Sequence, residues 1–225
     1  MADGRRNAGR ALTVLAATSV ALLFGGLAIG VALGGRPPLP YGSVAAVQQY
    51  VQNQPSALRV IAVTTFASSV LLAVYVGTVS ARLRRLGDTG AGPTIALTGG
   101  ILAAGTLGLT GLLGWTLSRP EITGDTTLVR SLYLLTFLVG GAAHVVALGV
   151  LIAGIATSGL ALGLLPRAVA WVGIAIAALC ELTMLVLAWQ PLGPALPVAR
   201  VAALAWLLVA GARLPTRRND STTAT

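Results

Sequence analysis

Charge is scarce in this sequence, and lysine is missing altogether. Only 9% of the 225 residues are charged, 56% are hydrophobic, and the mean hydropathy is +0.86. A soluble domain needs roughly 25% charged residues to cover its surface. The composition therefore excludes a water-soluble domain and indicates a membrane protein of packed helices. All fifteen basic residues are arginine, which together with abundant Ala, Gly, Leu and Val indicates a high-GC bacterial genome.

Cysteine and histidine occur once each, as Cys180 and His144. A single cysteine cannot form an internal disulfide, and a single histidine cannot build a histidine-rich metal site. A Ser/His/Asp triad would need an acid at the depth of His144, and the sequence places none there. The arginines are spread over loop ends, which argues against nucleic acid as a partner. We expect no metal, no cofactor and no enzymatic activity.

Six apolar runs are long enough to cross ~30 Å of hydrocarbon, which takes about 20 residues at 1.5 Å each. They lie at residues 11–34, 58–80, 94–117, 129–156, 167–189 and 196–213. The first run is too long for a signal peptide and no convincing cleavage site follows it, so we interpret it as a retained span. The sequence thus predicts an all-α polytopic bundle of six transmembrane helices over residues 11–213.

The arginines also predict the orientation, because short arginine-rich loops stay on the cytoplasmic side. With the N-terminus inside, ten arginines are cytoplasmic and five are outside. We therefore expect a multi-pass protein of the cell membrane, with residues 1–10 and a disordered tail, 214–225, both in the cytoplasm. Arg82, Arg84 and Arg85 share one inner loop, where they mark topology and attract anionic lipid head groups.

Residues 35–57 form the longest outer connection. PPLPY is followed by SVAAVQQYVQNQP, in which Val44, Val47, Tyr50 and Val51 recur at helical spacing until Pro55. This pattern predicts a short amphipathic helix at the outer interface. Such a helix is either a lid that seals the bundle or a gate for a substrate.

Glycine is abundant, with 28 residues, and two spans carry it at regular spacing. The rows are Gly26, Gly30 and Gly34 in the first span, and Gly105, Gly108, Gly111 and Gly114 in the third. Small residues at such spacing let helix backbones approach closely in lipid. The neighbour belongs either to the same chain or to a second copy in a homo-oligomer.

Glu181 is the single acid in the stretch AIAALCELTMLVLAW, residues 175–189. It lies eight residues before Trp189, or ~12 Å below the outer interface, and Arg200 lies ~5 Å below the same interface. An arginine side chain nearly spans the difference, so the sequence predicts a Glu181–Arg200 ion pair. His144 lies ~21 Å deep, counted from Arg130. The alternatives are a water-linked proton or substrate path through His144 and Glu181, or neither arrangement.

Other charged residues fall near the outer ends of spans. Arg59, Arg130 and Arg200 could form a cationic ring that holds a lipid phosphate or an anionic solute; alternatively, each extends to the head groups separately. Glu121 and Asp125 in EITGDTT belong to a solvated loop or contact a cation at the outer surface.

A resemblance to a known family covers most of residues 45–215. It is carried by four segments: FLVGGAAHVVALGVLIAG, LLPRAVAWVGIAIAALCEL, PVARVAALAWLLVAGARLP and RLRRLGDTGAGPTIALTGG. Together they resemble a family of uncharacterised multi-pass membrane proteins of high-GC bacteria, one of the domain-of-unknown-function groups. The resemblance implies a six-helix bundle and no assigned activity. The residues it places at the family's recurrent positions are His144, Pro166, Arg167, Glu181, Arg200, Trp206, Leu214 and Pro215.

Together these features predict a binding, accessory or structural component of the cell membrane. One alternative is a small permease or proton-coupled carrier using Glu181 and His144, and another is anion or anionic-lipid binding at the outer arginines. A carrier would be indicated by an inverted repeat with interrupted helices. The sequence shows neither an internal period nor a proline at the centre of a span.

Overall fold

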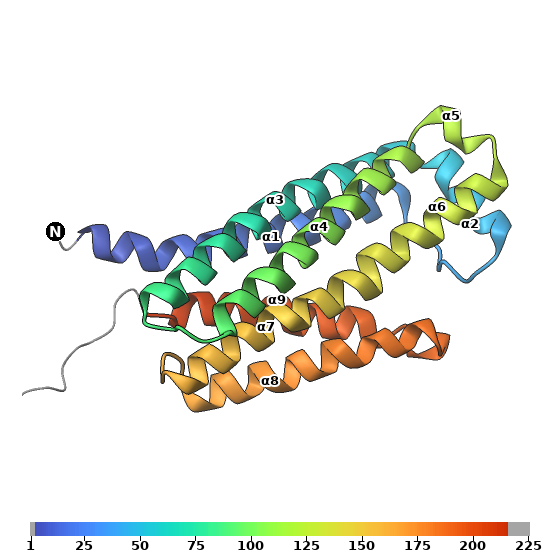
Figure 1. The fold of residues 1–225 in the computed structure, drawn as a ribbon. Coiled ribbons are helices and arrows are strands. Elements are labelled where there is room, and N and C mark those ends of the chain that lie inside the picture. The colour runs from blue at the N-terminus through green and yellow to red at the C-terminus, as the bar shows by residue number, and fades with distance from the viewer. Residues whose placement is uncertain (1–2, 216–225) are drawn as a thin grey trace, which may run out of the picture.

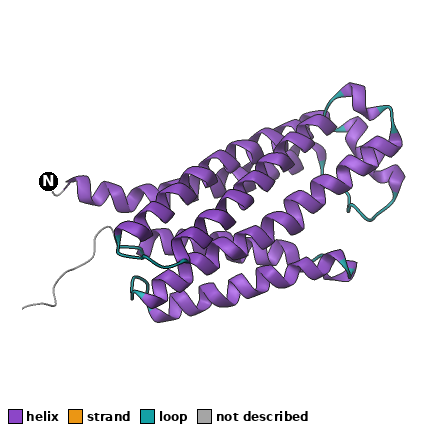
Figure 2. Ribbon diagram, in the orientation of Figure 1, coloured by secondary structure: helices purple, strands orange, loops and turns teal. Residues whose placement is uncertain are grey.

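The computed structural model describes residues 3–215, and the side chains from Leu12 onward except Gln190. Within that range the chain consists of helices and short connections (Figures 1 and 2). Six helical segments are long and apolar enough to cross a membrane: Leu12–Gly34, Pro55–Arg85, Gly92–Leu117, Thr126–Ala161, Arg167–Leu187 and Ala195–Arg213. The predicted all-α polytopic bundle is confirmed. The part of the predicted tail at 216–225 lies outside the described residues.

Four of the six spans are single α-helices, and the other two contain a segment of another helix type. The elements along the chain are α1 (Asp3–Gly34), α2 (Val44–Asn53), α3 (Pro55–Arg85), α4 (Gly92–Leu117), α5 (Pro120–Thr123), α6 (Thr126–Leu138), α7 (His144–Ala161), α8 (Arg167–Leu182) and α9 (Ala195–Arg213). A π-helical turn, η1 (Val139–Ala143), joins α6 to α7 within the fourth span. A 3-10 segment, η2 (Thr183–Leu187), extends α8, and a second, η3 (Gln190–Leu192), precedes α9.

The helices run up and down, with their connections at two ends of the bundle. The start of α1, the end of α9, and the α3–α4 and α7–α8 connections lie at one end, whereas α2 and α5 lie at the other (Figure 1). Gly87 and Gly163 follow α3 and α7 with φ of 94° and 63°, a left-handed conformation that ends a helix and that glycine adopts without strain. The predicted alternation of spans is confirmed, and the assignment of one end to the cytoplasm stays a prediction.

The glycine rows pack inside the chain. A Cβ atom on Gly26, Gly30 or Gly34 of α1 would collide with α3 side chains, and one on Gly111 of α4 would collide with the main chain of α3 at Ala62 and Phe66. In this bundle the rows serve to bring α3 close to its two neighbours. Gly105 has open space beside it. The rows therefore give no support for a homo-oligomer, which stays a prediction.

Hydrogen bonds to main-chain carbonyls join helices across otherwise apolar faces. The Ser19 hydroxyl of α1 donates to the Ser68 carbonyl of α3 at 2.9 Å, and the Ser68 hydroxyl donates to the Ser19 carbonyl at 2.8 Å. The indole Nε1 of Trp206 donates to the Val169 carbonyl at 2.8 Å, while its ring packs on Gly173 of α8. These contacts fix the rotation of each helix about its own axis.

Helix α2 covers the end of the bundle that the arginines predict to be outside. Val47, Tyr50 and Val51 are buried, as the spacing predicts, and Val44 is exposed. The side-chain amide groups of Gln48 and Gln52 donate to the Thr123 carbonyl of α5 at 2.7 and 3.1 Å. The predicted amphipathic helix is confirmed, and its apolar side packs on the bundle.

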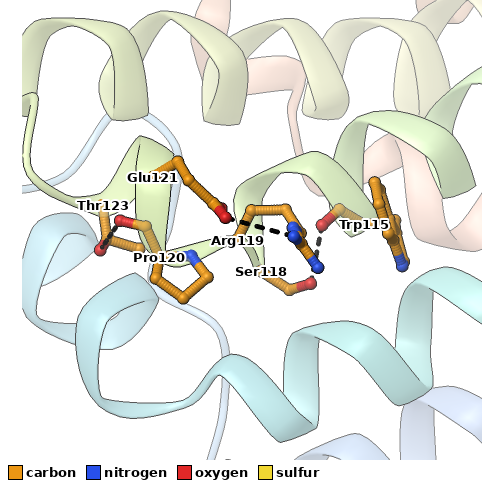
Figure 3. Close-up of polar contacts among 6 residues, drawn as sticks. All are labelled: Trp115, Ser118, Arg119, Pro120, Glu121 and Thr123. Carbon is orange, nitrogen blue, oxygen red and sulfur yellow. Dashed lines mark hydrogen bonds and ion pairs between the residues drawn. The ribbon is translucent and has the colours of Figure 1, made fainter.

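The turn between α4 and α5 positions the Thr123 carbonyl for α2 (Figure 3). Arg119 lies over the ring of Trp115, 5.1 Å from its centroid, and pairs with Glu121 at 3.2 Å. A hydrogen bond to its own backbone N–H, together with the charge of Arg119, lowers the pKa of Glu121. Asp125 caps α6 by accepting from two main-chain N–H groups. Both acids thus have local structural contacts, and no described group of three metal-ligating side chains forms here.

Candidate functional site

Glu181 lies on α8 against α7. Its carboxyl oxygen occupies the space that a side chain on Gly149 of α7 would need, and the residue is half-buried. It makes no hydrogen bond or ion pair with any other described residue. The predicted Glu181–Arg200 ion pair is therefore not formed. Residue counts give depth along a helix, but contact also requires that the two side chains leave their helices toward each other.

Arg200 points into the bundle. It shares the inner face of α9 with Leu196 and Leu204, which are buried four residues before and after it. Its Nε atom is buried and has no hydrogen-bond partner, and the guanidinium forms no ion pair with the described part of the chain. A charge at membrane depth without a counterion is costly, and such residues mark functional sites.

The Arg200 side chain lines a cavity of about 370 Å³ between five segments of the bundle. The lining residues are Leu23, Phe24 and Leu27 of α1; Ile61 and Thr65 of α3; Leu107 and Thr110 of α4; Thr136, Phe137, Gly140 and Gly141 of α6 and η1; and Gly193, Leu196, Pro197 and Arg200 at α9. The walls are apolar except for three threonines and this one arginine. Cavities of roughly 300–1,000 Å³ with few polar groups are typical of small-ligand sites.

Three helices indicate the depth of the cavity. Its lining residues on α1, α3 and α4 lie six to eleven residues from the ends of these helices beside α2 and α5. Six to eleven residues of helix span ~9–16 Å. The cavity therefore lies below the membrane interface, in the half of a ~30 Å hydrocarbon layer that is nearer α2 and α5.

One of the three threonines leaves its hydroxyl group free. Thr110 and Thr136 donate to carbonyls of their own helices, four residues back, at 2.8 and 2.7 Å. Thr65 is only 6% exposed and makes no hydrogen bond with the described residues. Arg200 and Thr65 are thus the two lining side chains whose polar groups remain available to a ligand. Nothing in the sequence distinguishes Thr65 from Thr64 beside it.

His144 lies one turn below the floor of the cavity. It is fully buried, and its Nδ1 lies 2.9 Å from the Ala103 carbonyl of α4. Because a carbonyl can only accept, Nδ1 carries the proton in this contact and a neutral ring keeps Nε2 as an acceptor. Nε2 has no hydrogen-bond partner among the described residues, and Arg200 is the nearby charge that acts on the ring. The structure thus brings His144 near Arg200 and does not join it to Glu181.

The predicted outer arginine ring does not form. Arg59 is exposed on α3, where it lines a shallow groove with Ser56 and Thr64. Arg130 of α6 donates to the Gly42 carbonyl at 3.1 Å and so holds the segment before α2. Arg200 lies in the interior cavity, apart from both. The three arginines lie apart because their side chains leave their helices in different directions. Depth in the membrane does not specify those directions.

The three arginines at the end of α3, Arg82, Arg84 and Arg85, also do not act together. Arg82 is only 8% exposed, whereas Arg84 and Arg85 are exposed at the end of α3. A buried arginine cannot lie among lipid head groups, so the prediction of a contact with anionic lipid no longer includes Arg82. It remains a prediction for Arg84 and Arg85.

The π-helical turn forms one wall of the cavity and was not predicted. Gly140 and Gly141 of η1 line the cavity, and the Thr110 side chain of α4 fills the space beside Gly140. Single π turns inside α-helices occur frequently at functional sites. The adjacent glycines in FLVGGAAH are the sequence feature that could have indicated an irregular turn.

Comparisons with protein-family models, with curated proteins and with solved structures each find no match. The resemblance to a domain-of-unknown-function family therefore stays a prediction. The cavity at Arg200 is the candidate site on the strength of its own geometry: a cation and a hydroxyl group without partners among the described residues, set in apolar walls below the membrane interface.

Proposed function

We propose that this membrane protein is a non-enzymatic binding component whose cavity holds an anionic ligand at Arg200. The observation that carries the proposal is the absence of a counterion for Arg200 among the described residues. A ligand that supplies the missing negative charge gains a charge-assisted hydrogen bond inside an environment of low dielectric constant. The apolar walls add affinity for the hydrocarbon part of the same ligand.

The chemistry of the lining supports binding over catalysis. Arg200 supplies charge and Thr65 a hydroxyl group, and the rest of the described lining supplies no carboxylate, thiol or imidazole that could act as a general base. His144 is fully buried beyond the floor and bonded to Ala103. These groups can orient and neutralise an anion.

Thermal unfolding in nanodiscs of zwitterionic lipid tests the proposal. The probes are octanoate, octyl sulfate and octyl phosphate below their micellar concentrations, with octan-1-ol as the uncharged reference. We expect at least one anion to stabilise the wild type and to have no effect on Arg200→Gln. Arg59→Gln, which removes an equal charge outside the cavity, is the matched control and should respond like the wild type. Equal responses of both variants would contradict the proposal.

A second candidate is a carrier for the same ligand, and the π-helical turn in the fourth span favours it. Single π turns within α-helices are frequent at functional sites, and η1 lies in the cavity wall. In a carrier, the wild type in proteoliposomes would take up a labelled ligand, and Gly140→Ala would slow uptake more than binding. Binding without uptake would favour the binding component.

We propose further that both termini face the cytoplasm, as the arginine count predicts. A phosphatase fused after residue 215 should be inactive in intact cells, and a fluorescent protein at the same position should be fluorescent. The opposite pattern would reverse the orientation without altering the bundle.

A further inference from the structure

The size of the cavity limits what can bind at Arg200, if the proposed function holds. A volume of about 370 Å³ lies at the lower end of the ~300–1,000 Å³ that is typical of small-ligand sites. The cavity therefore suits a small molecule better than a phospholipid with two acyl chains.

The depth of the cavity also argues against a lipid head group. Membrane lipids keep their charged groups at the interface, whereas the lining residues of α1, α3 and α4 lie ~9–16 Å from the helix ends beside α2 and α5. The α8–α9 connection, which leads to Arg200, ends well short of α2 and α5 (Figure 1). A lipid would have to draw its phosphate below the interface to reach Arg200.

The polar groups of the cavity match a single negative charge. Arg200 is the one cation of the lining, and the buried hydroxyl group of Thr65 is free. A carboxylate has one charge and two oxygens, which can accept from these two donors. A phosphate monoester has up to two charges and three terminal oxygens, so it would leave charge and acceptors unsatisfied in an apolar cavity.

From these observations we infer that the ligand is a small hydrophobic carboxylic acid, bound as its carboxylate between Arg200 and Thr65 with its hydrocarbon part against Phe24, Leu107 and Phe137. Free acids of this kind partition into bilayers, so the ligand can reach the cavity from the membrane as well as from water. The inference specifies the ligand class of the proposed site and rests on that site.

Equilibrium binding of radiolabelled octanoate to the full-length protein in phosphatidylcholine nanodiscs tests the ligand class. We expect saturable binding that unlabelled octanoate or 3-phenylpropionate displaces, and that octyl phosphate, octan-1-ol and palmitate displace at least tenfold less well. Thr65→Val keeps the shape of the side chain and should weaken octanoate about tenfold, the size of one hydrogen bond to a charged group. Thr64→Val, on the same helix, is the control and should leave affinity unchanged.

The outcomes separate the ligand class from the proposed function. If octyl phosphate or a phospholipid occupies the site in an Arg200-dependent way and octanoate does not, the ligand class is overturned and the proposed function stands. If Arg200→Gln leaves the binding of every anion unchanged, both fail. Displacement by the five competitors uses the wild type alone, so it decides the question even where a variant does not fold.

Discussion

Replacing Arg200 with methionine should stabilise the ligand-free protein. Methionine is an unbranched side chain of similar reach, so it can fill the same space against Leu196 and Leu204 without a charge. The change removes a guanidinium whose Nε is buried without a partner. In most proteins the loss of a buried arginine is destabilising, because it breaks a pair, and here there is no pair to break.

The expected gain is about 2 kcal/mol. An arginine at the centre of a membrane helix costs ~2.5–3.5 kcal/mol on insertion scales, and one orphaned donor costs ~1–3 kcal/mol. Arg200 is half-buried and keeps part of its solvation, so the gain should fall below the first range and within the second. For a chain of this length, 2 kcal/mol raises the unfolding temperature by about 4–8 °C.

The assay is reversible unfolding in nanodiscs, followed by tryptophan fluorescence, without and with octanoate. Arg200→Met should unfold at a higher temperature than the wild type without ligand, and octanoate should stabilise only the wild type. Arg59→Met, at an exposed position, should change stability by less than 0.5 kcal/mol. A loss of stability in ligand-free Arg200→Met would refute the reasoning, because it would show that Arg200 already has a favourable partner.

Three further predictions concern other parts of the bundle. Glu181→Gln should leave stability unchanged within about 1 kcal/mol, since no cation is lost, and a larger loss in the same unfolding assay would reveal a partner. Ser19→Ala and Ser68→Ala should each cost ~1 kcal/mol, and their double-mutant cycle should show a coupling of ~0.5–1.5 kcal/mol, whereas strict additivity would mean that the reciprocal bonds are independent. Because the folded structure lowers the pKa of Glu121, its contribution should be complete above pH 4.5 and disappear as the pH falls through the lower folded value. Amide exchange at Thr123 measures this directly, and exchange that stays constant down to pH 3 would contradict it.

The sequence predicted the number and limits of the spans because a long apolar run has few alternatives in a membrane. It also predicted the helix of residues 44–53, since Val47, Tyr50 and Val51 recur at helical spacing. The glycine rows predicted close approach of helices correctly, but they did not identify the neighbour. That neighbour depends on which face of each helix turns inward, and small residues alone do not encode it.

The candidate site was predicted in part. Arg200 and His144 were both selected from the sequence, because charged or titratable groups at membrane depth are rare. Their proximity was not predicted, since residue counts from the outer interface gave depths of ~5 Å for Arg200 and ~21 Å for His144, and nothing indicated the inward rotation of α9. Nothing in the sequence marks Thr65. It matters because its hydroxyl group makes no hydrogen bond with the described residues, and only the tertiary structure determines that.

Hydrophobicity and chain length by themselves determined that this protein is a bundle of six membrane-spanning helices, because backbone polar groups in hydrocarbon must be satisfied within helices. Which side chains meet was decided only by the tertiary structure. Glu181 packs against Gly149, and Arg200 lines an apolar cavity, because of how each helix is rotated about its own axis. That rotation is set by the packing of glycines and serines across all the interfaces together.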